Sequence, residues 1–123
     1  MKADKPHNAK SFLNNSIKVK DKTILINHIV KTVEQKTGLS LLELKRIKTQ
    51  KQLYKIGLFY FTTTNKTICE ALIIPVEAGT RRKRDLQKER RLIASLKKGI
   101  CPFTGHRAKF LSTNPNNYND LLK

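Results

Sequence analysis

Apolar residues recur at helical spacing through the first half of the chain. Between residues 23 and 36 they share one face of a helix, because they lie three or four positions apart: Leu25, Ile26, Ile29, Val30 and Val33. Gly38 follows, and glycine readily takes the left-handed backbone that ends many helices. The pattern predicts a helix over residues 23–36 that ends at Gly38.

One or two more helices are predicted before residue 62. Ser40 and Glu43 have the spacing of a capping box, in which the two side chains bond backbone N–H groups at the start of a helix. The apolar residues that follow at helical spacing are Leu41, Leu44 and Ile47. Residues 49–61 are expected to continue this helix or to start another, with Leu53, Ile56, Tyr60 and Phe59 on the face toward the core. Gly57 would let a neighbouring element approach this helix closely.

The next segment predicts two helices that are joined by a tight turn. Residues 62–65 form a polar linker, in which Thr64 or Asn65 is suited to cap a helix over residues 66–73. Pro75 ends that helix and suits the start of the next one, over residues 76–90. The second helix is strongly basic, with a cationic set that comprises Arg81, Arg82, Lys83, Arg84, Lys88, Arg90 and Arg91.

After the basic helix the pattern changes to alternation. Residues 93–97 and 108–113 read as strands, and residues 98–107 between them contain the turn formers Gly99, Pro102 and Gly105. Together they predict a β-hairpin. The tail, residues 114–123, begins with a turn and is expected to end as a short helix or to fray.

Charge dominates the composition. The chain has 26 Lys and Arg against 9 Asp and Glu, which gives a net charge of +17. Residues 1–22 contain six of the lysines and are predicted to form a flexible basic arm, with a short strand around Ile17 and Val19. Such charge indicates a polyanionic partner.

No apolar run approaches the ~20 residues of a membrane-spanning helix. Without an export signal, a cytoplasmic, nucleoid-associated protein whose Cys69 and Cys101 are free thiols is expected.

The two helices and their turn resemble the winged helix-turn-helix DNA-binding family. The resemblance covers about residues 50–113 and rests on Ile68, Glu70, Ala71, Leu72, Ile74, Pro75, Arg81, Arg82, Leu86, Lys88, Glu89, Leu92 and Ile93. It implies a mainly α fold, with a three-helix core and a hairpin wing in residues 49–113. Residues 23–48 would then be an N-terminal helical extension. Where the family has aliphatic residues this chain has Arg82 and Lys83, so one of their methylene stems should lie along the core.

The resemblance also implies which residues contact duplex DNA. A recognition helix in the major groove would use Glu77, Thr80, Arg81, Arg84 and Lys88, with Ala78 or Gly79 and Leu86 toward the core. The wing and the DNA backbone would meet through Lys97, Lys98, His106, Arg107 and Lys109. The start of the preceding helix would add Asn65, Lys66 and Thr67.

Several functions stay open at this point. The leading interpretation is a site-specific transcriptional regulator of a bacterium, phage or mobile element that binds double-stranded DNA. The sequence is compatible with a homodimer, and RNA is a less favoured partner than DNA. The alternatives are a replication or recombination accessory protein, and a packaging or protein-interaction module with non-specific nucleic-acid binding. No cofactor, metal site or enzymatic activity is predicted, because the cysteines and histidines are too scattered for zinc and the nine acids form no paired cluster.

Overall fold

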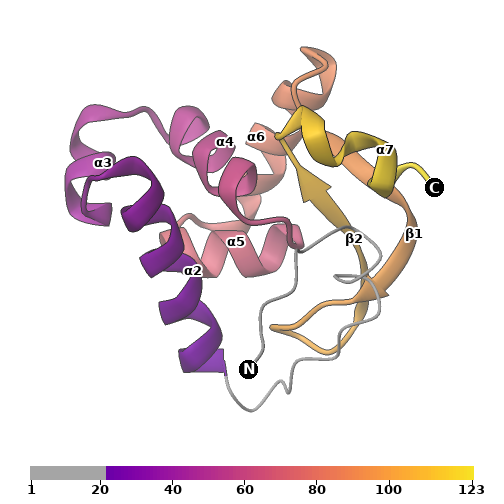
Figure 1. The fold of residues 1–123 in the computed structure, drawn as a ribbon, viewed down its shortest axis with the longest axis horizontal. Coiled ribbons are helices and arrows are strands. Elements are labelled where there is room, and N and C mark those ends of the chain that lie inside the picture. The colour runs from indigo at the N-terminus through magenta and orange to yellow at the C-terminus, as the bar shows by residue number, and fades with distance from the viewer. Residues whose placement is uncertain (1–21) are drawn as a thin grey trace.

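The protein is mainly helical with a small two-stranded antiparallel sheet, as the computed structural model of residues 22–123 shows (Figure 1). The expected basic arm and the short strand around Ile17 and Val19 fall almost entirely outside these described residues. The elements in chain order are α2 (Lys22–Thr37), α3 (Leu41–Ile47), α4 (Gln50–Tyr60), α5 (Asn65–Leu72), α6 (Val76–Lys88), β1 (Ile93–Ile100), β2 (Arg107–Ser112), the 3₁₀ turn η2 (Pro115–Asn117) and α7 (Tyr118–Leu121). Within this part of the chain no helix is long and apolar enough to cross a bilayer.

Local signals set the helix ends. Gly38 has a φ of 76°, and the expected capping box of Ser40 and Glu43 is present. A second capping box, of Thr49 and Gln52, starts α4 and was not predicted. Thr64 caps α5 by accepting a hydrogen bond from the Thr67 N–H. These local bonds satisfy backbone donors that the first turn of a helix leaves free.

Left-handed residues other than glycine follow α5 and α6. Ile73 has a φ of 57° after α5, and Arg90 has a φ of 61° after α6. The backbone then bonds back into each helix, from the N–H of Ile74 to the carbonyl of Cys69 and from the N–H of Arg91 to the carbonyl of Leu86, both at 2.9 Å. The basic helix therefore ends at Lys88, two residues earlier than predicted.

One hydrophobic core joins all the longer helices. The apolar face of α2, with Leu25, Ile29 and Val33, is buried in the same cluster as residues of α4, α5 and α6. The predicted extension is thus packed into a common core with the predicted motif. At the other end, Leu121 of α7 packs with Phe110 and Ile93 in a second, smaller cluster against the sheet.

The buried face of α4 differs from the prediction. Leu53 is buried as expected, but Tyr60 and Phe59 are exposed and Ile56 is only half-buried. Tyr54, Gly57 and Leu58 are buried in their place. Because α2, α5 and α6 all pack on α4, its covered face is wider than a single stripe and is turned toward these neighbours.

The predicted polar linker is also buried. Thr62, Thr63 and Thr64 are at most 3% exposed. Thr63 forms a β-bridge with Leu111, whose N–H donates to the Thr63 carbonyl at 2.8 Å. Thr63 therefore borders β2 on the side away from β1, and this pairing ties the segment between α4 and α5 to the hairpin.

The hairpin is longer than its sequence suggested. The expected loop at residues 98–107 is wrong at both ends, because Lys98, Gly99 and Ile100 pair with Lys109, Ala108 and Arg107. A tight turn needs few residues, so pairing continues to the bond between the Cys101 N–H and the His106 carbonyl at 2.7 Å. An irregularity between Ala94 and Lys98 bends β1.

Candidate nucleic-acid interface

The inner face of α6 is held against α5 by a close contact. Ala78, Gly79 and Leu86 are buried, as predicted. A Cβ on Gly79 would lie 2.2 Å from the Cys69 Sγ, so only glycine lets the two helices approach this closely. Arg82 confirms the expectation of a cationic side chain lying along the core, since its Nε is buried while its Nη1 reaches Asp85 at 3.4 Å.

The outer face of α6 presents charge to solvent. Glu77, Arg81, Arg84 and Lys88 are all exposed and follow one another at helical spacing, so they form a single stripe. Among the described residues no ion pair joins Arg81, Arg84 or Lys88 to an acid. Three cations on this stripe are therefore available to an external anion.

A polar chain fixes the crossing of three helices. The Tyr54 hydroxyl donates to the Asn65 Oδ1 at 2.7 Å, and the Asn65 Nδ2 donates to the Thr80 Oγ1 at 3.3 Å. Thr80 in turn donates to the Val76 carbonyl at 3.0 Å. Burial, reinforced by the neighbouring Cys69, raises the pKa of Tyr54 far above its ordinary value, so the hydroxyl stays a donor. Asn65 and Thr80, which were predicted to contact DNA, already serve this internal chain.

The start of α5 is only partly available to a ligand. Thr67 is fully buried, and its hydroxyl lies 2.9 Å from the Thr64 Oγ1 and 3.4 Å from the Cys101 Sγ. The Thr67 side chain therefore cannot reach a DNA strand, and it supports the end of the hairpin. Lys66 is half-exposed and forms an ion pair with Glu70 at 3.0 Å.

The hairpin carries the predicted cations at its surface. Lys97, Lys98, His106, Arg107 and Lys109 are exposed. The register places Lys98 directly opposite Lys109. Like charges in such a cross-strand position destabilise a sheet, and no ion pair with a described acid relieves them.

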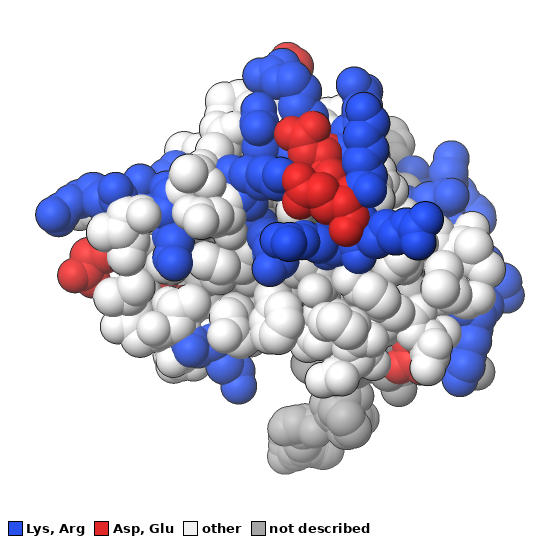
Figure 2. All heavy atoms as spheres, turned by 90° about the horizontal axis from the view of Figure 1, so that it is seen from above, with Lys and Arg blue, Asp and Glu red and all other residues white. Residues whose placement is uncertain are grey.

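Part of the basic surface is neutralised near the end of α6. Figure 2 shows one face of the molecule, on which Lys and Arg side chains surround a small group of acidic side chains. Glu89 is surrounded by cations in this way, since its Oε2 pairs with the Lys51 Nζ of α4 and its Oε1 lies 3.9 Å from the Arg91 Nε. The hydrogen bond from Lys51, with the charges of Lys51, Arg91 and Lys55, lowers the pKa of Glu89. These cations have a structural partner, unlike those of the exposed stripe.

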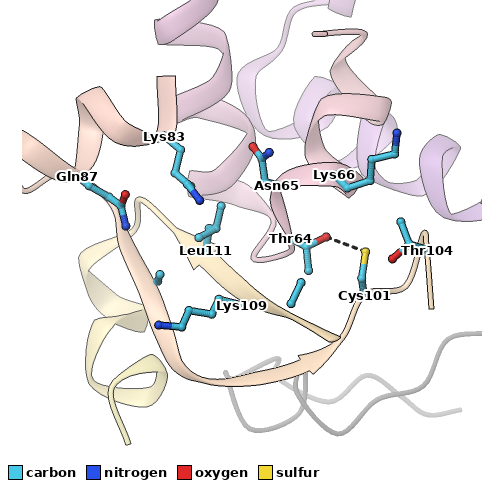
Figure 3. A pocket seen from close by; sticks show the side chains of 11 residues that line it. Thr64, Asn65, Lys66, Lys83, Gln87, Cys101, Thr104, Lys109 and Leu111 are labelled. Atoms are coloured by element: carbon cyan, nitrogen blue, oxygen red, sulfur yellow. Dashed lines mark hydrogen bonds between the residues drawn. The ribbon is translucent and has the colours of Figure 1, made fainter. Parts of the chain in front are cut away.

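A cleft of about 490 Å³ opens between α6, the start of α5 and the hairpin (Figure 3). Its polar lining comes from all three elements: Thr64, Asn65, Lys66, Lys83, Gln87, Thr104 and Lys109. Lys83 and Gln87 extend from α6 and Lys109 lies along the opposite wall, while Lys66 turns away (Figure 3). No Asp or Glu lines the cleft.

Cys101 lies in the wall of this cleft, hydrogen-bonded to threonines. Its Sγ is 3.0 Å from the Thr64 Oγ1. Burial raises the pKa of the Cys101 thiol, but hydrogen bonds from Thr104, Thr64 and Thr67 outweigh burial and place the pKa below its ordinary value. Cys69 differs, because burial raises its pKa to about 11. Both cysteines are free thiols.

Sequence reasoning did not assign Lys83 and Gln87 to a binding surface. A signal was present, because Val76, Thr80, Lys83 and Gln87 form a second stripe on α6 at helical spacing. Lys83 and Gln87 of that stripe line the cleft only because the hairpin returns beside α6, which helical spacing alone does not encode.

The fold and its surface define a mainly helical protein with a small hairpin and a basic face built on α6. Within residues 22–123 no group of three or more His, Cys, Asp or Glu side chains is placed to hold a metal ion. No family model, curated protein or solved structure matches the chain.

Proposed function

We propose that the protein binds double-stranded DNA by placing α6 in the major groove, in the manner of a winged helix-turn-helix protein. The observation that carries this proposal is the exposed stripe of Arg81, Arg84 and Lys88, which has no acidic partner among the described residues. The guanidinium fork of arginine matches the O6 and N7 atoms of guanine, so this stripe is suited to reading bases.

The order of the elements supports the same proposal. Helix α4 is followed by the Thr63 bridge, by α5 and α6, and then by a hairpin whose β2 strand pairs with Thr63. This is the order of helices and strands expected of a winged helix. The Gly79 contact and the chain from Tyr54 to Thr80 fix α6 against α4 and α5, and side chains on a helix that is fixed in this way are held in register for reading bases.

The biological role that we propose is transcriptional regulation in a bacterium, phage or mobile element, by binding rather than by catalysis. The exposed hairpin cations would add affinity through phosphates, which positions the protein without specifying sequence. A homodimer would add a second half-site, although the groove contacts of one chain do not require it.

The experiment is selection of bound duplexes from a random pool at about physiological salt. Recovery of one motif is expected for a site-specific regulator. Arg81→Ala and Arg84→Ala should then each lose about 1–3 kcal/mol of discrimination between that motif and random duplex. Lys36→Ala, which removes an exposed cation from the last turn of α2, is the matched control and should keep the discrimination. Equal weakening of every duplex by the arginine changes would refute base reading.

A second candidate function is sequence-independent nucleic-acid binding, as in packaging. The net charge of +17 favours it, since charge alone binds any duplex. Here the selection would recover no motif, and affinity for all duplexes would fall together as salt rises.

A further inference from the structure

We propose that the cleft between α6 and the hairpin is a phosphate-binding site, occupied in the complex by the sugar–phosphate backbone of one DNA strand. The inference deepens the proposed DNA binding, on which the identity of the occupant rests. It assigns a role to Lys83 and Gln87 and separates their task from that of Arg81 and Arg84.

The lining has the chemistry that a phosphodiester requires. Two walls supply ammonium groups, from Lys83 on α6 and from Lys109 on β2, and Gln87 adds amide donors (Figure 3). Neither lysine has an ion-pair partner among the described residues. Lysine ammonium groups with no carboxylate nearby bind an anion by charge, and they accept it in many orientations.

The register of the hairpin gives a second, independent observation. Arg107, Lys109 and Leu111 alternate along β2, so their side chains share one face of the sheet. Leu111 belongs to the core and lines the cleft, so this is the face toward α6. Lys98 is the cross-strand partner of Lys109 and lies on the same face. Two facing lysines that repel each other at rest are stabilised when a polyanion lies between them and α6.

The dimensions leave room for more than a single ion, as a segment of a nucleic-acid strand requires. A volume of about 490 Å³ lies within the range of ligand pockets, roughly 300–1,000 Å³, and far exceeds one water or phosphate. The cleft runs beside the helix that would enter the major groove, and the backbone borders that groove. The strand would lie between Lys83 and Lys109 on the two walls, with Lys98 beside Lys109 on the same face of the hairpin.

The first arm of the test measures how duplex affinity depends on salt. The variants are Lys83→Gln, Lys109→Gln and their combination, with Lys36→Gln as the matched control. Each lost phosphate contact should reduce the slope of log K against log salt by about 0.9, so the combination should reduce it by about 2. Selected and random duplexes should weaken by the same factor, unlike the Arg81 and Arg84 variants. A combination whose slope equals that of Lys36→Gln would overturn the backbone assignment.

The second arm tests the cleft without DNA. Pyrophosphate is titrated into the full chain while nuclear magnetic resonance follows the Gln87 side-chain amide and the backbone amides of Ala94 and Ala108, which line the cleft. Saturable shifts at these groups, lost in the Lys83→Gln and Lys109→Gln combination, would support the site. Shifts of equal size around Lys36 would overturn it. If no duplex binds at all, the proposed function fails, and this titration still decides whether the cleft holds phosphate.

Discussion

Replacement of Gly79 by alanine tests whether the close approach of α5 and α6 organises this protein. Gly79 lies inside α6, where an alanine would normally stabilise a helix by about 1 kcal/mol. At this position the added Cβ would meet the Cys69 Sγ at 2.2 Å and the Asn65 Oδ1 at 3.2 Å. The first separation is well inside the ~3.5–4.0 Å at which non-bonded heavy atoms attract.

The clash should outweigh the gain in helix propensity. Cys69 is fully buried, so the sulfur must turn into a packed core or the two helices must move apart. Overpacking of this kind costs about 1–3 kcal/mol, and sometimes more. A contact this short belongs at the upper end, so after the propensity gain we expect Gly79→Ala to lose roughly 2 kcal/mol of unfolding free energy.

Urea unfolding followed by circular dichroism measures this loss, and a double-mutant cycle identifies its cause. Cys69→Ala removes the sulfur that the new methyl would meet. The combination of Gly79→Ala with Cys69→Ala should therefore be more stable than the sum of the two single changes predicts, by about 1–3 kcal/mol of coupling. A Gly79→Ala protein as stable as wild type, or a cycle without coupling, would refute the proposed contact between α5 and α6.

Two further predictions concern strain and thiol chemistry. Ile73→Gly should stabilise the protein by about 1 kcal/mol, because a β-branched residue is strained at a φ of 57° and Ile73, which is 70% exposed, loses little packing. Leu42 is equally exposed but lies in a helix, so Leu42→Gly should destabilise the protein in the same urea titration. A loss of stability in Ile73→Gly would contradict the strain. Iodoacetamide at about pH 8 should modify Cys101 before Cys69, because a pKa of about 11 leaves roughly one Cys69 thiol in a thousand ionised, whereas the pKa of Cys101 is lowered. Peptide mass spectrometry would show the order of modification. Faster modification of Cys69 would contradict the prediction.

The candidate interface was predicted in part. The exposed stripe with Arg81 and Arg84 follows from helical spacing, because neighbours on one face of a helix are fixed by its geometry. The fate of Thr67 could not be predicted, since its burial depends on Cys101, 34 residues away along the chain. Polar residues next to a helix start look alike in sequence whether they face solvent or another element.

The sequence by itself determined the features that local chemistry controls. The helix at residues 22–37, its end at Gly38 and the capping box of Ser40 all depend on neighbours within a few residues or on one helix face. Hairpin formation was predicted as well, from alternation around a turn-rich segment.

Only the tertiary structure decided which surfaces are covered. It turned Tyr54 and Leu58 into the core, buried the threonines at residues 62–64 against β2, and brought Lys109 across from Lys83. These outcomes depend on how helices cross and how strands pair between distant segments. The period of a helix or a strand shows which residues share a face, whereas the packing of the whole chain determines what that face meets.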